Sequence, residues 1–132
     1  MKTPAETCVL IVDDDVHLRD AMALAVQRKG YQVMGAMSGN EATALLKNHK
    51  VDIVLSDIRM ANGDGMELLN YIRAFVPTPP SVVLVTGYSD FTAEEALRVG
   101  AAAVIAKPFE RMKLIGELDR IIGYERFEKK SA

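Results

Sequence analysis

The sequence predicts a single α/β domain in which a parallel sheet is covered by helices on both faces. Apolar runs typical of buried strands alternate with stretches of helical length along the 132 residues. The runs CVLIV, DIVLS and SVVLV are almost continuously apolar, as expected of strands that are covered on both faces. Because crossovers between parallel strands are right-handed, this alternation predicts a doubly wound three-layer sandwich of five βα units.

The expected strands are the apolar runs at residues 8–12, 31–36, 52–56, 81–85 and 103–106. The expected helices lie at about 15–29, from 38 or 39 onwards, at about 65–75, at about 90–99, and along the apolar stripe of 114–122. Asp15 is a typical N-cap for the first helix, and Gly30 should end it. The proline-rich stretch 77–80 cannot be helical, so it should form a stiff surface connection.

The composition indicates an ordinary soluble domain. Apolar residues make up 49% of the chain, and the net charge of −2 gives no general attraction for nucleic acid. Cys8 is the only cysteine, which excludes an internal disulfide and a cysteine-based zinc site. No apolar stretch approaches the ~20 residues that span a bilayer, and the first residues do not resemble a signal peptide. We therefore expect a cytoplasmic protein that binds neither nucleic acid nor membrane.

Chemically active side chains follow four of the expected strands at the point where each strand ends. Asp13 and Asp14 follow the first strand, Asp57 the third, Thr86 the fourth and Lys107 the fifth. The carboxyl ends of parallel strands meet at one edge of the sheet, where ligands bind in open α/β folds. We therefore expect three carboxylates, a hydroxyl and an ammonium to converge on one cleft.

This set of side chains suits phosphoryl chemistry. Close carboxylates repel one another, and a hard divalent cation such as Mg²⁺ (or Mn²⁺) relieves the repulsion. Asp13 and Asp14 form a natural metal-holding pair, while Lys107 and Thr86 can hold phosphate oxygens. Asp57 is the best-placed nucleophile for forming an aspartyl phosphate.

The ordered motifs LIVDDD, SDIRM…DG, VTGYSD and AKPF resemble the receiver domain of bacterial two-component response regulators. The resemblance covers about residues 7–122, and the spacing of its motifs is highly specific. It implies a flavodoxin-like fold with strand order 2-1-3-4-5, similar to that of the chemotaxis response regulator. Residues 123–132 would then be a charged, frayed tail or the start of a linker to an output domain.

The resemblance implies which residues take part in phosphorylation. Asp57 would accept a phosphoryl group from a sensor histidine kinase or a phosphotransfer protein. Asp13 and Asp14 would hold Mg²⁺ together with Asp57 and the backbone carbonyl of Arg59. We thus expect a phosphoacceptor signalling domain and not an enzyme that turns over a substrate.

The resemblance also implies a conformational switch at the ends of the fourth and fifth strands. Thr86 and Lys107 would grip the phosphoryl group, Gly87 would leave room for it, and the peptide bond from Lys107 to Pro108 would be cis. The family usually has Tyr or Phe three residues before this lysine, whereas this chain has Val104. A valine cannot make the inward swing of an aromatic ring, so we expect a weaker response or a different route.

The expected partners follow from the same resemblance. A sensor histidine kinase or a phosphotransfer protein would supply the phosphoryl group. The face formed by the helix at 90–99, the strand at 103–106 and the last helix would contact a second copy of the domain, an output domain or a downstream protein.

Three further positions lie in the loops around the expected site. Arg59 and Tyr88 lie two residues beyond Asp57 and Thr86, and we predict that they shield the acyl phosphate from water and slow its hydrolysis. The alternative is that both are solvated surface side chains. The family usually has proline at the position of Ala61, and its loss removes a φ restriction from the loop.

Two other functions stay open from the sequence. The run from Asp13 to Asp15 contains the D-x-D of haloacid-dehalogenase-like phosphatases, in which Asp13 would be the nucleophile and Asp15 the general acid. His17 stands where that family prefers Thr or Val, and no acidic pair follows Lys107. The other alternative is a pseudo-receiver, a binding module that works without phosphate; Val104 favours it, whereas the intact acidic pair, acceptor and lysine oppose it.

Overall fold

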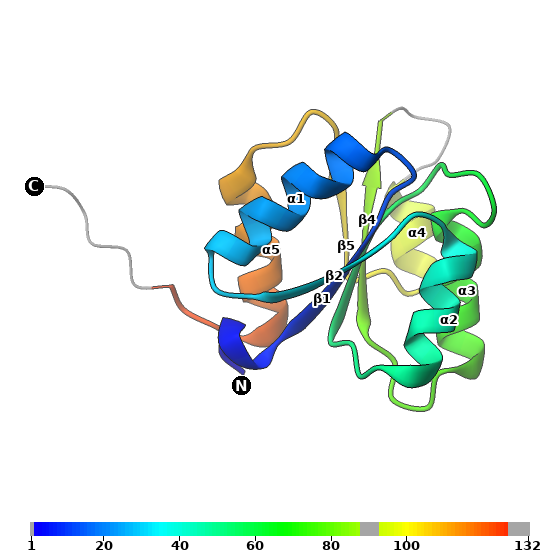
Figure 1. Cartoon of the computed structure of the whole chain (residues 1–132), viewed down its shortest axis with the longest axis horizontal. Helices are drawn as coiled ribbons and strands as arrows, with labels where there is room; N and C mark the ends of the chain where they lie inside the picture. The colour runs from blue at the N-terminus through cyan, green and yellow to red at the C-terminus, as the bar shows by residue number, and fades with distance from the viewer. Residues whose placement is uncertain (1, 88–92, 127–132) are drawn as a thin grey trace, which may run out of the picture.

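The computed structural model describes residues 2–87 and 93–126. Within these ranges, five parallel strands form one sheet in the order β2-β1-β3-β4-β5, as predicted (Figure 1). The strands are β1 (Cys8–Val12), β2 (Gln32–Ala36), β3 (Ile53–Asp57), β4 (Ser81–Thr86) and β5 (Ala103–Ala106). The helices are η1 (Pro4–Glu6), α1 (Val16–Arg28), α2 (Gly39–Asn48), α3 (Gly65–Phe75), α4 (Ala93–Val99) and α5 (Arg111–Ile122). In this described part of the chain, none of the helices has the length and apolar character needed to cross a membrane.

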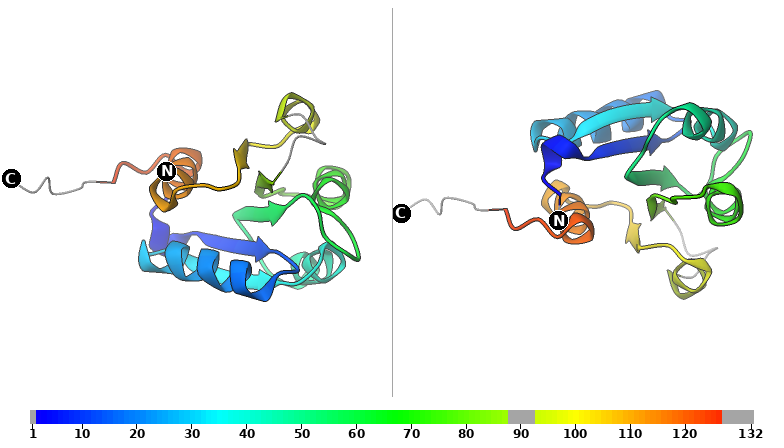
Figure 2. Two further views of the ribbon diagram at one scale, coloured as in Figure 1. Left: turned by 90° about the horizontal axis from the view of Figure 1, so that it is seen from above. Right: turned by 90° about the horizontal axis from the view of Figure 1, so that it is seen from below.

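The two faces of the sheet carry separate apolar cores, because alternate residues of each strand point to opposite sides. Val9 and Ile11 of β1 belong to the core under α1 and α5, whereas Leu10 and Val12 belong to the core under α2, α3 and α4. Figure 2 shows this division of the helices between the two faces. Each fully buried side chain of this size contributes about 1.5–3 kcal/mol through the hydrophobic effect. The doubly wound sandwich predicted from the apolar runs is confirmed.

Side-chain N-caps fix where three of the helices begin. The Asp15 carboxylate accepts hydrogen bonds from the backbone N–H groups of His17 and Leu18, at 2.9 and 3.2 Å, and so begins α1 as predicted. Ser38 caps α2 and Asp64 caps α3 in the same way. The loops that follow β1, β2 and β3 are therefore anchored at their helical ends.

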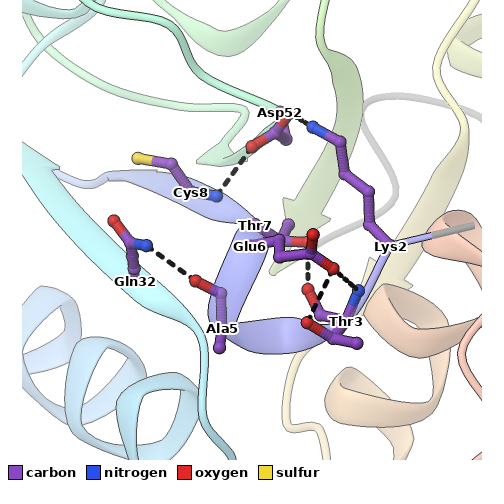
Figure 3. A network of polar contacts seen from close by, with 8 residues as sticks. All are labelled: Lys2, Thr3, Ala5, Glu6, Thr7, Cys8, Gln32 and Asp52. Atoms are coloured by element: carbon purple, nitrogen blue, oxygen red, sulfur yellow. Dashed lines mark hydrogen bonds and ion pairs between the residues drawn. The ribbon is translucent and has the colours of Figure 1, made fainter.

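The amino-terminal edge of the sheet is closed by the first residues of the chain, including η1, which the sequence did not predict. Lys2 forms an ion pair with Asp52, whose other carboxylate oxygen accepts a hydrogen bond from the N–H of Cys8 at 2.8 Å (Figure 3). The Gln32 side chain donates to the carbonyl of Ala5 at 2.7 Å. These contacts tie the segment before β1 to β2 and to the start of β3.

The residues directly after α5 contact the rest of the domain through residue 126. Gly123 ends α5 in the left-handed region, with φ of 71°, and the chain then turns back. The guanidinium of Arg126 binds the buried carboxylate of Asp119 with two hydrogen bonds, of 2.9 and 3.1 Å. Arg126 also donates to the carbonyl of Lys29 at 3.1 Å. The remaining tail and the predicted helix start at 90–92 lie outside the described residues.

Candidate functional site

Four neighbouring strands end at the same edge of the sheet and bring the predicted residues together. β3 pairs with β1 on one side and with β4 on the other, and β4 pairs in turn with β5. β3 ends in Asp57 and β4 in Thr86, while Asp13 and Lys107 are the first residues after β1 and β5. The parallel register therefore places these four residues side by side, as the sequence predicted.

Asp57 and Lys107 form an ion pair at the centre of this edge. The Nζ of Lys107 lies 3.1 Å from the Oδ2 of Asp57 and donates a hydrogen bond to it. The Asp57 side chain is 14% exposed and that of Lys107 is 24% exposed, so a reactant in solution can reach both. The backbone N–H of Lys107 donates to the carbonyl of Thr86 at 2.7 Å, which fixes the lysine at the end of β5. Its ammonium can balance negative charge on Asp57 or on a group attached to it.

Asp13 is fully buried beside this ion pair and is incompletely satisfied. Its Oδ1 accepts a hydrogen bond from the N–H of Asp15 at 2.9 Å, whereas its Oδ2 is buried without a partner. Burial raises the pKa of the Asp13 carboxyl above its ordinary value, and the carboxylates of Asp57 and Asp14 raise it further. The N–H of Asp15 and the ammonium of Lys107 oppose this shift in pKa. Such a carboxylate is a poor structural element and a good ligand for a cation.

Asp14 projects from the same turn toward the loop that follows β3. Its side chain is exposed, and its Oδ2 accepts a hydrogen bond from the N–H of Ala61 at 3.2 Å. A proline at position 61 would have no N–H to donate, so this contact requires a residue other than proline there. One carboxylate thus links the loops that follow β1 and β3.

Backbone contacts hold the loop after β3 close to the strand ends. The N–H of Ile58 donates to the carbonyl of Val85 at 3.0 Å, and the N–H of Gly65 donates to the carbonyl of Ile58 at 2.8 Å. A Cβ atom on Gly65 would lie 2.5 Å from the carbonyl oxygen of Asp57, which only glycine avoids. The glycine that closes the SDIRM…DG motif therefore lets α3 begin directly against Asp57.

The other residues of the predicted switch lie near the carboxyl ends of β4 and β5. Gly87 is exposed, and a Cβ atom there would lie at an ordinary contact distance of 3.9 Å from the Cδ of Lys107. The peptide bond between Lys107 and Pro108 is cis. Val104 is half-buried, lies opposite Leu84 of β4 and packs against the core under α2, α3 and α4. This position therefore offers no aromatic ring that could move between the surface and the core.

The acidic pair fits a hard divalent cation. Among the residues that the structure describes, no three His, Cys, Asp or Glu side chains form a ready metal cluster. Mg²⁺ does not require one, because it is commonly bound through one or two carboxylates and keeps several water ligands. The unpartnered Oδ2 of Asp13 is the donor that most needs such a cation, and Asp14 follows it on the same turn.

One predicted residue lies at the margin of this arrangement, and one residue is new. Arg59 is exposed in the loop after β3, and Tyr88 falls outside the described residues, so their effect on phosphoryl lifetime stays a prediction. The sequence analysis did not single out Arg19 of α1, whose Nη1 donates to the carbonyl of Asp13 at 2.7 Å. The sequence offered only a weak signal, a basic residue in the helix that follows the acidic run.

The carboxyl edge of this parallel sheet brings together an acidic pair, a further aspartate and a lysine. This arrangement is typical of α/β domains that handle phosphate. Comparison with known families is more specific, because the response regulator receiver domain family matches residues 9–119. The chain belongs to this family and is a receiver domain of two-component response regulators. Phosphorylation and Mg²⁺ binding are typical of the family.

Individual relatives agree with this assignment. Transcriptional regulatory protein ZraR of Salmonella typhimurium strain LT2 is 35% identical over 118 residues, which cover 89% of this chain and 27% of ZraR. The C4-dicarboxylate transport transcriptional regulatory protein DctD of Rhizobium meliloti strain 1021 is 40% identical over 112 residues, covering 84% of this chain and 24% of DctD. The chain thus spans about a quarter of the length of these curated relatives.

Solved structures of isolated receiver domains match the chain over most of its length. The CheY-like response regulator receiver domain protein from Methanospirillum hungatei JF-1 is 29% identical, with a TM-score of 0.79. The match covers 89% of this chain and 94% of that protein. The fold described above is therefore the receiver fold from β1 to α5.

Proposed function

We propose that Asp57 accepts a phosphoryl group from a sensor histidine kinase or a phosphotransfer protein and that this modification controls an output. The observation that carries the proposal is the ion pair between Asp57 and Lys107 beside the buried, unpartnered carboxylate oxygen of Asp13. A nucleophilic carboxylate, a cation for the incoming phosphate and a donor for a metal ion thus occupy one edge of the sheet.

The transfer would proceed by attack of a carboxylate oxygen of Asp57 on the phosphorus of a phosphohistidine. An O–P bond forms, the P–N bond breaks, and its electron pair stays on the departing imidazole nitrogen. Asp13 and Asp14 would hold Mg²⁺, with Asp57 and the backbone carbonyl of Arg59 as further ligands. When bound, Mg²⁺ neutralises charge that develops on the phosphoryl oxygens.

The residues at the ends of β4 and β5 would then respond to the new group. A phosphoryl group adds nearly two negative charges and three strong acceptor oxygens. Lys107 is already paired with the acceptor carboxylate, and Thr86 carries a hydroxyl at the end of the neighbouring strand. Both would bind phosphoryl oxygens, and Gly87 would leave the approach to them open.

The output would follow from a shift between two conformations of the face formed by α4, β5 and α5. To turn a domain that is 99% inactive into one that is 99% active, phosphorylation must favour the active state by about 5.5 kcal/mol. Val104 supplies no switching ring, so we propose that the coupling runs through the backbone. The hydrogen bond from the Lys107 N–H to the Thr86 carbonyl provides a direct link between β4 and β5.

The partners proposed for this domain follow from the family and its relatives. The curated relatives ZraR and DctD are transcriptional regulatory proteins about four times as long as the matched region. We propose that this domain acts in the cytoplasm on an output domain, a downstream protein or a second copy of itself, through α4, β5 and α5.

The experiment that tests the proposed function is intact-mass measurement after incubation with Mg²⁺ and acetyl phosphate. The wild type should gain one phosphoryl group, and this gain should be absent in Asp57→Asn and in samples without divalent cations. Asp52→Asn, at the other end of β3, is the matched control and should gain the group normally. A phosphoryl group gained equally by Asp57→Asn, or a wild type that gains none under any condition, would contradict the proposal.

We also propose that Arg59 and Tyr88 lengthen the life of the acyl phosphate by restricting access of water. The exposed position of Arg59 in the loop after Asp57 supports this role for the arginine. The double substitution Arg59→Ala, Tyr88→Ala should therefore speed the loss of the phosphoryl group from the purified protein. A lifetime that is unchanged or longer in the double variant would refute the proposal.

A further inference from the structure

The turn that carries the acidic pair is fixed by a hydrogen bond within itself and by hydrogen bonds to two other elements. The N–H of Asp13 donates to the carbonyl of Ala36, at the end of β2, at 3.1 Å. The Oδ1 of Asp13 accepts from the N–H of Asp15, within the turn itself. The carbonyl of Asp13 accepts from the Nη1 of Arg19, on α1, at 2.7 Å. Only the Oδ2 of this buried residue is left without a partner.

Arg19 is placed for this contact by the neighbouring strand. Its side chain lies across Gly35 of β2, where a Cβ atom would stand 3.5 Å from the Cδ of Arg19 and 3.7 Å from its Nε. The aliphatic stem therefore packs on the strand while the guanidinium reaches the turn after β1. A rigid, planar guanidinium held in this way loses little freedom when it donates its hydrogen bond.

The choice of acceptor on Asp13 matters for the chemistry of the site. Arg19 binds the main-chain carbonyl of Asp13 through Nη1, so this bond leaves the carboxylate available. Because the peptide group is planar, a hydrogen bond to this carbonyl also fixes the N–H and the Cα of Asp14. This contact thus acts on the peptide group that joins the two acidic residues.

We propose that Arg19 is a positioning residue that orients Asp13 and Asp14 for a divalent cation without itself contacting the cation or the phosphoryl group. This inference rests on the proposed function. Residues that orient metal ligands from behind typically change metal affinity by 10–100-fold when they are removed. Arg19 should therefore set the Mg²⁺ affinity of the folded domain and leave the chemistry at Asp57 unchanged once the cation is bound.

The test compares divalent-ion binding by variants at position 19, with Mn²⁺ as a probe that electron paramagnetic resonance can count. Arg19→Ala and Arg19→Met should each weaken Mn²⁺ binding by about tenfold. Arg19→Met keeps an unbranched stem to pack on Gly35 and removes the donor together with its charge, so it also decides the question if Arg19→Ala does not fold. Arg19→Lys, which retains a donor, should recover part of the affinity. Arg28→Ala, at the other end of α1, is the matched control and should bind as the wild type does.

A second readout separates positioning from a merely structural role. The rate of phosphorylation by acetyl phosphate should fall in Arg19→Met at limiting Mg²⁺ and return to nearly the wild-type rate at saturating Mg²⁺. Folded Arg19→Met that binds Mn²⁺ with wild-type affinity would overturn the inference while phosphorylation of the wild type leaves the proposed function intact. A wild type that neither binds Mn²⁺ nor gains a phosphoryl group would overturn both.

Discussion

Strand β3 has an aspartate near each end, and each aspartate is paired with a lysine from another part of the chain. At the amino-terminal edge, Asp52 binds Lys2 and also accepts a hydrogen bond from the N–H of Cys8 (Figure 3). At the carboxyl edge, Asp57 binds Lys107 but lies beside Asp13, whose carboxylate has a buried oxygen without a partner. The same residue types thus stand in two different electrostatic settings.

The two edges of the sheet differ in whether the charge of a carboxylate favours or opposes folding. Burial alone would raise the pKa of Asp52, but the Cys8 N–H and the Lys2 ammonium hold the pKa below its ordinary value, so its charge favours folding. The pKa of Asp13 is raised, first by burial and then by Asp57 and Asp14, so its charge opposes folding. The Asp13 carboxylate, which has one oxygen without a hydrogen-bond partner, is therefore available to a ligand.

The largest expected difference between the two edges is kinetic. Lys107→Met removes the cation beside Asp57 and should slow phosphorylation by acetyl phosphate by about a hundredfold, as the loss of one preorganised donor commonly does. Lys2→Met removes the lysine at the other edge and should leave this rate unchanged. Intact-mass time courses at saturating Mg²⁺ measure both rates, and equal rates in the two variants would remove the distinction between the edges.

Substitution of the aspartates should change stability in opposite directions. Without divalent cations at neutral pH, Asp13→Asn should stabilise the domain by about 1 kcal/mol, because it removes a buried charge with an unsatisfied oxygen. Asp52→Asn should destabilise it by about 1 kcal/mol, since a charge-assisted hydrogen bond and a partly exposed ion pair are lost. Urea unfolding measures both changes, and two shifts of the same sign would contradict the comparison.

The two substitutions should also differ in how they change the stabilisation of the domain by Mg²⁺. A ligand that binds only the folded state raises its stability by mass action, so the wild type should gain stability with Mg²⁺ concentration. Asp13→Asn should gain much less, and Asp52→Asn should gain as much as the wild type. If Mg²⁺ stabilised Asp13→Asn as strongly as the wild type, Asp13 would not be a ligand.

A smaller effect is expected in the pH dependence of stability. The ionised Asp52 stabilises the folded state above its ordinary pKa of 3.8, and this contribution should disappear as pH falls through its lower folded-state value. The ionised Asp13 destabilises the folded state above its raised pKa, and this cost should disappear as pH falls toward 3.8. Unfolding of the wild type and both variants over a falling pH series should show both differences shrinking.

Much of the carboxyl edge was predictable from the sequence, whereas little of the amino edge was. Buried parallel strands leave continuous apolar runs, and the residue after each run must lie at the shared edge, so Asp13, Asp57 and Lys107 could be placed together. The segment around η1 has no periodicity, and it is held by contacts such as that between Lys2 and Asp52, which are 50 residues apart. A local sequence pattern does not reveal a pair of residues so far apart in the chain.

The same limit explains the other omissions. Arg126 folds back onto Asp119, which lies buried on α5, and Arg19 reaches the turn after β1 across Gly35 of β2. Each contact joins elements whose distance is fixed only by the complete fold. The charges of these residues were visible in the sequence, but their partners were not.

The most direct test of the central claim is to identify which carboxylate carries the phosphoryl group. After incubation with Mg²⁺ and acetyl phosphate, borohydride reduction converts an aspartyl phosphate to homoserine, and mass spectrometry of peptides locates the converted residue. We expect homoserine at position 57 alone. Conversion at Asp13, the nucleophile of the phosphatase alternative, or at Asp52, in the structural pair of the other edge, would contradict it.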